Sequence, residues 1–333
     1  MAVDASCALL GWYIVDKRRL AWRAEAGERP DPYRVWLSEI MLQQTTVAAV
    51  KPYFEKFTAR WPTVQALAAA EEGQVMAAWA GLGYYARARN LIACARAVAA
   101  SGGNFPDEEA ELRKLPGIGR YTAAAIAAIA FGRRAVVVDA NVERVVSRLF
   151  AVKEPLPGSR ERLYALTDTI TPAESAGDFA QAMMDLGSTI CTPRAPDCPR
   201  CPLLPFCAAG QVGEGELYPV KAPKAAKPKR EGTAWWLEHD GRVLLVRRPA
   251  KGLLGGMLAL PTDAPPAEAA WLEAGSVDHV FTHFALNMRL LCAQADGEAP
   301  EGHWHPIDEL EEAGLPTLFA RLAARGREWR QAA

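Results

Sequence analysis

The stretch LPGIGRYTAAA, residues 115–125, places a proline and two glycines directly before an alanine-rich run. Gly117 and Gly119 predict a tight turn, because glycine adopts backbone conformations that other residues avoid. The alanine-rich run predicts a helix, and the turn with its helix should extend over residues 115–131. The glycine amides and the first free amides of the helix would form an anion site, for which a backbone phosphate is the natural ligand. A turn before a helix is common, so this stretch alone assigns no function.

The composition indicates a folded protein with no global preference for a polyanion. The chain has 333 residues, 50% of them hydrophobic, which is enough for two domains with separate cores. The formal net charge is -1, so any nucleic-acid site must be a local basic surface. Apolar runs stay shorter than the roughly 20 residues of a membrane span, and the N-terminal segment lacks the pattern of a signal peptide. We therefore expect a cytoplasmic protein that does not contact membranes.

The pattern of apolar residues divides the chain into two domains. Helical periodicity broken at Pro and Gly predicts a mostly α domain over residues 1–208. Residues 209–231 are rich in Pro, Gly and Lys and predict an extended linker, more readily a solvated tether than a DNA-binding arm. Residues 232–333 predict an α+β domain, with a hairpin at Asp240-Gly241, further strand over 277–295 and a terminal helix over 308–326.

Four of the seven cysteines cluster, in a proline-rich loop over residues 191–207. Four thiolates in one loop would repel one another unless a metal centre takes up their charge. Zinc is the commoner ligand of four cysteines, but the first gap of six residues does not fit the paired CxxC pattern of zinc ribbons. Cys7, Cys94 and Cys292 lie apart from this loop and are expected to be small buried hydrophobic residues. The clustered cysteines are Cys191, Cys198, Cys201 and Cys207.

Several motifs in this order resemble the helix-hairpin-helix DNA glycosylase superfamily and, within it, the adenine glycosylases of the MutY type. The motifs are LPGIGRYTA, VVVDANVERV and the cysteine loop, together with SEIMLQQTTV at 38–47, GLGYYARARN at 81–90 and FAQAMMDLGSTICTP at 179–193. The resemblance extends from Trp22 to Cys207 and resumes in a Nudix-like C-terminal domain. It implies a [4Fe-4S] cluster on the four cysteines. It also implies a monomer, nucleoid-associated in a bacterium, that removes adenine mispaired with 8-oxoguanine or guanine in double-stranded DNA during base excision repair.

Two carboxylates are the candidate catalytic groups. Glu39 lies in the apolar helical stretch WLSEIMLQQT, where burial would raise its pKa, although a lone helix glutamate is usually partly exposed. The resemblance implies that Glu39 protonates adenine at N7, since the base leaves readily only when protonated. Asp139 is expected to cap a helix, and the backbone hydrogen bonds that it accepts there would keep its carboxylate ionised. The resemblance implies that Asp139 stabilises the cationic sugar and that Asn141 orients groups beside it.

Tyr121 occupies the position where endonuclease III relatives carry a lysine that forms a Schiff base with the sugar. A phenol cannot form that imine, so the resemblance implies a monofunctional glycosylase in which water is the final nucleophile. We expect the Tyr121 hydroxyl to hydrogen-bond near Asp139. A bifunctional glycosylase and lyase is the alternative enzyme, and a non-catalytic iron-sulfur DNA-binding or redox-sensing protein is the alternative from another class.

The resemblance also implies residues that handle the DNA. Target bases must leave the duplex, at a cost of a few kcal/mol that inserted side chains offset. Residues expected to enter the duplex are Leu42, Gln44 and Tyr84, and those expected to line the adenine pocket are Trp22, Arg23 and Gln181.

The C-terminal domain resembles a Nudix module without the catalytic Nudix sequence, so recognition is the expected role rather than pyrophosphate hydrolysis. The segment DHVFTHF resembles a loop that reads 8-oxoguanine, with Thr282 where the family more often has serine. Without the resemblance, its histidines would be ordinary strand residues. The residues implied in recognition are His279, Phe281, Thr282 and His283.

Overall fold

The computed structural model describes residues 2–25, 27–223, 226–249, 252–295 and 299–332. The chain divides into two compact units, Met1–Ala69 with Ala93–Lys224, and Ala70–Ile92 with Ala225–Ala333. The second unit therefore combines a helical segment, residues 70–92, with the C-terminal residues. The expected division at 208 and 232 assigns that segment to the N-terminal domain instead. None of the helices in the described ranges combines the length and apolar character that a membrane crossing requires.

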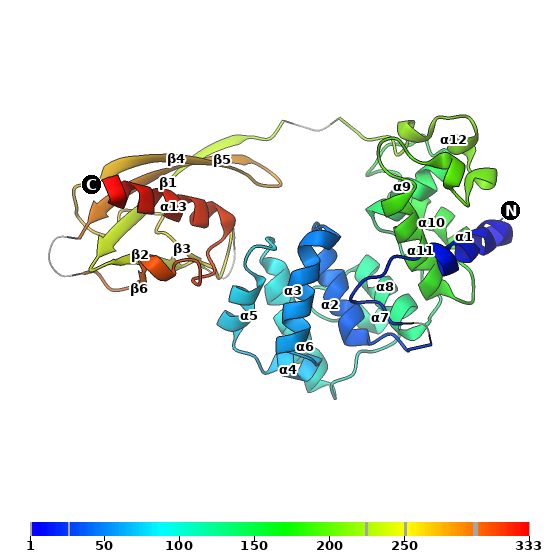
Figure 1. The fold of residues 1–333 in the computed structure, drawn as a ribbon, viewed down its shortest axis with the longest axis horizontal. Coiled ribbons are helices and arrows are strands. Elements are labelled where there is room, and N and C mark those ends of the chain that lie inside the picture. Colours follow the sequence, from blue (N-terminus) through cyan, green and yellow to red (C-terminus); the bar gives the residue numbers. More distant parts are fainter. Residues whose placement is uncertain (1, 26, 224–225, 250–251, 296–298, 333) are drawn as a thin grey trace. The chain divides into compact units, whose positions relative to one another are not determined.

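The N-terminal two thirds of the chain are helical, as the periodicity predicts (Figure 1). One helix, over residues 2–16, falls where the sequence shows only a short apolar patch, so the pattern did not predict it. The α-helices are α1 (Ala2–Asp16), α2 (Pro32–Leu42), α3 (Val47–Arg60), α4 (Val64–Ala68), α5 (Glu72–Trp79), α6 (Ala86–Ala100), α7 (Glu109–Leu112), α8 (Arg120–Phe131), α9 (Ala140–Leu149), α10 (Arg160–Ile170), α11 (Ala176–Thr189) and α12 (Ala208–Gln211). Short 3-10 helices are η1 (Cys198–Arg200), η2 (Leu204–Phe206) and η3 (Gly215–Leu217).

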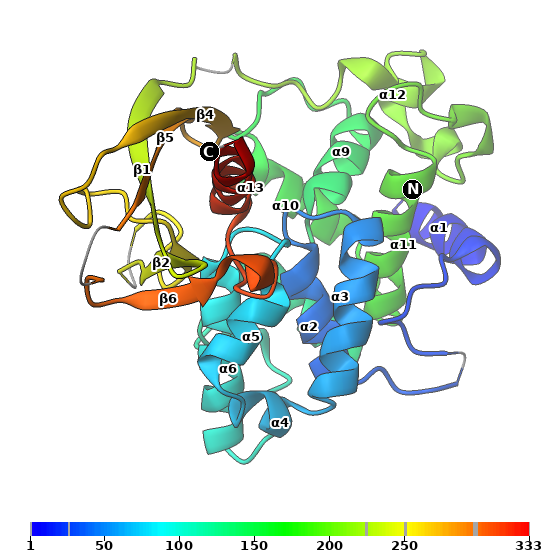
Figure 2. The same cartoon turned by 60° about the vertical axis from the view of Figure 1, so that its left-hand side comes forward.

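Helix α11 packs against α8, α9 and α1, and α2 packs against both α8 and α3. Figure 2 shows α11 beside α1 and α2 beside α3. A glycine sets the α11–α8 distance: a Cβ on Gly177 would lie 2.5 Å from the Ala128 carbonyl oxygen. All alanines of α8 except Ala130 are at most 1% exposed, so small side chains let neighbouring helices approach closely on several sides. This packing places α2, α8 and the start of α9 around one site.

The stretch at 115–131 folds as predicted. Ile118 N donates to the Leu115 carbonyl at 3.2 Å, and Gly117 takes a positive φ of 75° that favours glycine. Gly119 is the N-cap of α8, and Gly132 ends the helix in the left-handed region. The turn therefore leaves the first amides of α8 available at its N-terminus.

The C-terminal residues form a six-stranded sheet in the order β3-β2-β1-β5-β4, with β6 paired to β2. β1 is antiparallel to β2 and parallel to β5, and α13 packs against β4, β5 and β1 (Figure 1). The predicted turn at Asp240-Gly241 is present, with φ values of 46° and 69°. The elements are β1 (Lys229–His239), β2 (Arg242–Arg247), β3 (Leu258–Ala259), β4 (Leu272–Val280), β5 (Ala285–Gln294), β6 (His303–Pro306), η4 (Ile307–Glu309) and α13 (Thr317–Ala332).

Three predicted segments differ in extent from the structure. The terminal helix begins at Thr317 rather than at 308, because Pro316 is suited to the start of a helix but not to its interior. The strand expected over 277–295 is a hairpin of β4 and β5 joined at residues 281–284. The linker expected over 209–231 contains η3, and β1 already pairs with β5 from Lys229. Residues 224 and 225 of this segment lie outside the described ranges.

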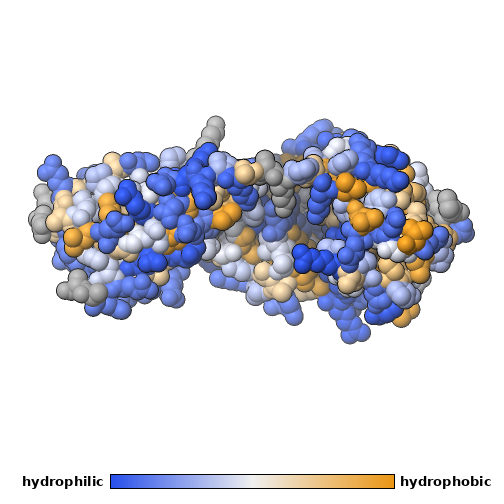
Figure 3. All heavy atoms as spheres, turned by 90° about the horizontal axis from the view of Figure 1, so that it is seen from above, coloured by the Kyte–Doolittle hydropathy of each residue, from blue (hydrophilic) through white to orange (hydrophobic). Residues whose placement is uncertain are grey.

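The face of the molecule seen in Figure 3 is mainly hydrophilic, and apolar residues occur on it singly or in small groups. Scattered apolar residues of this kind are normal on the surface of a folded protein.

Candidate functional site

Glu39 is buried in the middle of α2, with only 6% of its surface exposed. Its neighbours Trp36, Ile40 and Met41 are equally buried. Burial raises the pKa of Glu39 to about 7, against the hydrogen bond from Tyr121 and the charge of Arg23, which both lower it, and with the Asp139 charge, which raises it. The expected burial of Glu39 is thus present and gives the expected direction of the pKa shift, so Glu39 can carry a proton near neutral pH.

Tyr121, in the first turn of α8, donates its hydroxyl proton to Glu39 Oε2 at 2.6 Å. The hydrogen bond expected near Asp139 is formed, and its acceptor is the other carboxylate of the site. Burial, together with the charges of Glu39 and Asp139, raises the pKa of Tyr121 well above its usual range. The hydroxyl therefore remains a neutral donor that fixes one oxygen of Glu39.

Asp139 is the N-cap of α9, as predicted. Its Oδ1 accepts a hydrogen bond from Val142 N at 2.7 Å, and its Oδ2 accepts one from Asn141 Nδ2 at 3.0 Å. Burial raises the pKa of Asp139, although both hydrogen bonds act in the opposite direction. The expectation that capping keeps this carboxylate ionised therefore stays a prediction, because the hydrogen bonds favour the charged form and desolvation opposes it.

One side chain that sequence reasoning missed, Arg144, connects this carboxylate to the cysteine loop. Arg144 Nη2 donates to Asn141 Oδ1 at 2.8 Å and to the Gly187 carbonyl at 2.6 Å, while Nε donates to the Cys191 carbonyl at 2.8 Å. Asn141 in turn donates to Asp139. Asn141 lies three residues before the arginine in the motif VVVDANVERV, but the Gly187 and Cys191 carbonyls lie more than 40 residues away, so no local pattern indicates these two partners.

We expect Gly187→Ala to lower both stability and activity. A Cβ at Gly187 would lie 2.6 Å from the Asn141 Cβ and 3.2 Å from its Cα, so α9 and α11 must move apart. Overpacking of this kind typically costs about 1–3 kcal/mol. The thermal midpoint and the catalytic rate measure the two effects, and Gly73→Ala, where an added Cβ has open space, is the control. A wild-type rate with a lowered midpoint would show that Asn141 is not displaced.

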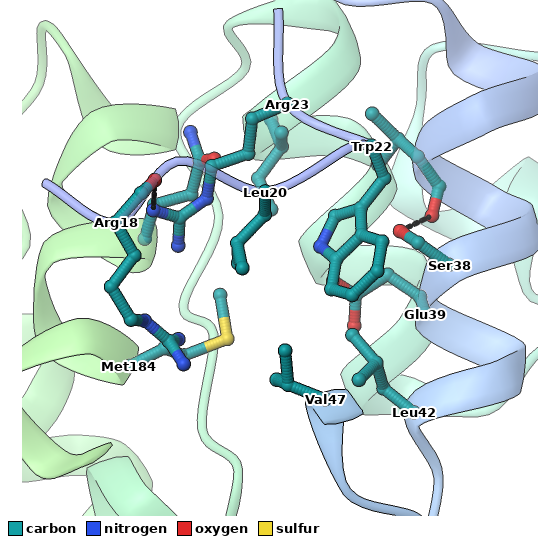
Figure 4. Close-up of a pocket in the computed structure, with 12 residues that line it drawn as sticks. Arg18, Leu20, Trp22, Arg23, Ser38, Glu39, Leu42, Val47 and Met184 are labelled. Atoms are coloured by element: carbon teal, nitrogen blue, oxygen red, sulfur yellow. Dashed lines mark hydrogen bonds between the residues drawn. The ribbon is translucent and has the colours of Figure 1, made fainter. Parts of the chain in front are cut away.

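A pocket opens beside Glu39, and all three residues expected to line it do so (Figure 4). Trp22 is 7% exposed and packs edge-on against Phe54, at 5.5 Å between ring centroids. Gln181 Nε2 donates to the Gly177 carbonyl at 3.4 Å. Residues of the wall that the sequence did not indicate come from the segment before α2 and from α2, α3, α8 and α11: Arg18, Leu20, Val35, Ser38, Val47, Ile129 and Met184.

The three side chains expected to enter DNA take different places. Leu42, the last residue of α2, lines the pocket. Gln44 and Tyr84 are exposed and have positive φ values of 57° and 49°, which are uncommon for residues other than glycine. Each of these two side chains is therefore presented to solvent from a strained backbone.

The loop at 281–284 brings the predicted recognition residues together. The rings of His279 and Phe281 lie 4.5 Å apart, and Phe281 N donates to the Phe284 carbonyl at 2.8 Å to close the turn. Thr282 and His283 are exposed at its tip, and the Thr282 hydroxyl lies 3.5 Å from that of Tyr84 in the same unit. His279 alone of the two histidines lies in a strand, and burial lowers its pKa.

The four loop cysteines are all partly buried, whereas the other three differ from expectation in one case: Cys94 and Cys292 are buried, but Cys7 is exposed on α1. Burial raises the pKa of Cys201 to about 12, and the charges of the other three loop thiols add to the shift. Arg148 Nη1 and Gly210 N each lie 3.2 Å from a thiol sulfur, those of Cys191 and Cys207. Such donors favour thiolates, so the donor chemistry fits a metal centre that neutralises them. In the described part of the chain, no group of three or more His, Cys, Asp or Glu side chains is arranged to hold a metal ion.

Comparisons with known proteins agree with this architecture. The HhH-GPD superfamily of base excision DNA repair proteins matches residues 37–168, and the NUDIX domain family matches residues 232–325. Human "Adenine DNA glycosylase" is 34% identical, over 95% of this chain and 72% of its own. A solved thermostable thymine-DNA glycosylase has a TM-score of 0.56 and 31% identity, covering 62% of this chain and 95% of that one. An endonuclease III–DNA complex has a TM-score of 0.52 and 26% identity, covering 62% and 94%.

Proposed function

The chain belongs to the adenine DNA glycosylases, enzymes that remove adenine from DNA by cleaving an N-glycosidic bond in base excision repair, and on this premise we propose how its residues perform the reaction. Glu39 is the general acid and Asp139 the anion that stabilises the sugar cation. The observation that carries the proposal is the buried Glu39 carboxyl in the wall of a pocket, where burial raises its pKa to about 7.

Proton transfer starts from Glu39. Its carboxylic acid protonates N7 of the flipped adenine, so that the C–N bond breaks with the electron pair leaving on a neutral base. Asp139, whose oxygens are fixed by Val142 and Asn141, supplies the negative charge that stabilises the oxocarbenium-like sugar. Water then adds to the sugar carbon and loses a proton, which returns Glu39 to its acid form. Tyr121 holds one Glu39 oxygen in place and carries no amine, so no imine with the sugar forms.

The assay is adenine release in single turnover on duplexes with adenine opposite 8-oxoguanine, guanine and thymine. We expect release opposite 8-oxoguanine and guanine, and strand cleavage only after alkali. Borohydride trapping of the wild-type protein on DNA would instead indicate the bifunctional reaction. Release that is equal opposite all three partners would contradict the proposed mispair specificity.

The rate should fall as pH rises through the pKa of Glu39, because the acid must be protonated. Tyr121→Phe removes the hydrogen bond that lowers this pKa. Such a bond is worth about 1 kcal/mol more to a charged acceptor than to a neutral one, so the alkaline limb should move up by about half to one unit. The pH profile of single-turnover release measures the shift, with Tyr53→Phe as the control on α3. An unmoved limb would mean that the phenol does not act on Glu39.

We propose that DNA contacts come from three places. The amides at Gly117 and Gly119 bind a phosphate, because they open the N-terminus of α8. Gln44 and Tyr84 enter the duplex from exposed positions, and Leu42 contacts the target nucleotide from the pocket edge. The rest of the pocket, with Trp22, Arg23 and Gln181, receives adenine.

We propose that the 281–284 loop reads 8-oxoguanine opposite the adenine. The support is a rigid turn with two exposed polar tips, Thr282 and His283, over a base of stacked aromatic rings. Thr282→Ala should reduce the preference for 8-oxoguanine over guanine without changing adenine release opposite guanine. We further propose that residues 1–208 and 232–333 are the catalytic and recognition domains, joined by a linker within 209–231 that limited proteolysis should cut.

We propose that Cys191, Cys198, Cys201 and Cys207 hold a [4Fe-4S] cluster, which would order their loop rather than take part in the chemistry. The support is the fit of four mutually interacting thiols with donors from Arg148 and Gly210. Anaerobically purified protein should be brown, because the cluster absorbs in the visible range, and should contain about four iron atoms per chain. A colourless protein that contains zinc would contradict the proposal.

A further inference from the structure

One fully buried carboxylate has no part in the mechanism described so far. Asp185, on α11, is 0% exposed and 167 residues away from its first partner in sequence. Its oxygens accept four hydrogen bonds: Arg18 N at 3.0 Å, Arg18 Nε at 2.5 Å, Arg23 Nη1 at 2.6 Å and Arg23 Nη2 at 2.8 Å. Every contact comes from the segment before α2, so Asp185 fastens that segment to α11.

The charges of this group do not cancel. Burial opposes the ionisation of Asp185, but the hydrogen bonds and charge of Arg23, with those of Arg18, outweigh it and hold the pKa of Asp185 below its usual range. Two guanidinium groups and one carboxylate therefore leave one net positive charge. Replacing Asp185 with a neutral residue would leave two.

Both arginines line the pocket, on the side drawn at the left of Figure 4, with Glu39 on the other. Asp185 holds both Nη1 and Nη2 of Arg23, and Nη1 also donates to the Arg18 carbonyl at 3.1 Å. Its charge is near enough to lower the pKa of Glu39. The other groups that act on Glu39 are Tyr121 from α8 and Asp139 from the start of α9.

We infer that Asp185 is a positioning residue for adenine excision: it fixes the Arg18 and Arg23 guanidinium groups in the pocket wall and offsets one of their two charges, so that Glu39 stays protonated. The inference rests on the proposed role of Glu39 as the acid. A purely structural Asp185 would hold the chain together without affecting the protonation of Glu39, and the two roles differ in their effect on the pH profile.

The test is the pH profile of single-turnover adenine release by Asp185→Asn. An unbalanced positive charge near a carboxyl group lowers its pKa by about 1–3 units. We expect the alkaline limb to move down by about one unit, which lowers the rate at pH 8 about tenfold. Asp178→Asn removes the same charge from an exposed position of α11 and should leave the limb where it is in the wild type. A limb that does not move in Asp185→Asn, with only a lower rate at every pH, would overturn the inference.

Asp185→Asn leaves the partly buried guanidinium groups of Arg18 and Arg23 short of a partner, which destabilises the folded state. A second comparison keeps the test decisive if this variant does not fold. Arg18→Met alone leaves Arg23 balanced by Asp185, whereas Arg18→Met with Asp185→Asn leaves Arg23 unbalanced. The limb of the double variant should lie about one unit below that of the single variant, and equal limbs would contradict the inference.

The proposed function fails in a different way. If Glu39 is not the acid, wild-type release shows no alkaline limb near pH 7, whatever Asp185 does. If Glu39 is the acid and Asp185 only structural, the wild-type limb is present and remains fixed across the Asp185 variants.

Discussion

Glu39→Gln should abolish adenine release and at the same time stabilise the folded protein above neutral pH. General acid catalysis contributes about 10²–10⁴-fold to a rate, and glutamine has no proton to give to N7. The amide keeps the size of the side chain, and its oxygen still accepts the hydrogen bond from Tyr121. Single-turnover release opposite 8-oxoguanine measures the loss, and binding to the same duplex should persist.

The stability change follows from the direction of the pKa shift. Glu39 has a folded pKa of about 7 against a usual value of 4.5, so the folded state binds the proton more tightly than the unfolded chain. Its contribution to stability is complete below the unfolded pKa and is lost as pH rises through the folded one. Glutamine does not titrate, so the variant should gain about 2–3 kcal/mol over the wild type between pH 5 and pH 8.

Urea unfolding followed by helical circular dichroism at both pH values measures this difference. Glu55→Gln, at an exposed position of α3, should show neither effect. A variant that is inactive but no more stable at pH 8 than at pH 5, relative to wild type, would mean that Glu39 is not desolvated in solution. A variant that still releases adenine within tenfold of wild type would remove Glu39 from the role of acid.

Asp139→Asn is the second change with a large expected effect. The substitution removes the anion that we propose stabilises the sugar cation, and the loss of one such stabilising group costs about 10²–10³ in rate. The cap itself should persist, because the asparagine oxygen can accept the Val142 N–H at Oδ1. The new amide meets the Asn141 amide across the former 3.0 Å contact, so one hydrogen bond worth about 1 kcal/mol is lost.

The expected signature is therefore a rate loss out of proportion to the stability loss. Single-turnover release and the thermal midpoint give the two quantities, and an exposed acid on α10, Glu161→Gln, serves as the control for charge alone. A rate within tenfold of wild type would show that the charge of Asp139 is dispensable. A collapse of the midpoint would show that the α9 cap, rather than the sugar, needs the carboxylate.

Local sequence patterns predicted the elements that depend on neighbouring residues. The turn at Asp240-Gly241, the α8 helix and the cap at Asp139 each rest on residues within a few positions of one another, and each is present. The start of the terminal helix was placed too early because acidic residues after 308 resemble a helix while Pro316 fixes its true beginning. α1 was missed because its buried residues are few and its periodicity is weak.

Contacts between distant segments could not be predicted in the same way. The partner of Tyr121 depended on which of two carboxylates the packing of α2 against α8 brings nearer, and that is Glu39. No local pattern distinguishes Asp185 from any other acid in a helix, since its arginines precede it by more than 160 residues. The raised pKa of Asp139 reflects burial by the whole unit, which outweighs the cap that the sequence shows.

If Gln44 and Tyr84 enter the duplex as proposed, their left-handed backbones bear on how fast the protein inspects a long duplex. Each such conformation costs about 1–3 kcal/mol, and this cost is part of the free energy of folding rather than of each encounter with DNA. A side chain whose backbone already has the conformation needed for insertion requires no rearrangement at each base pair. The time spent at an undamaged pair is then set by the duplex, which must yield, and not by the enzyme.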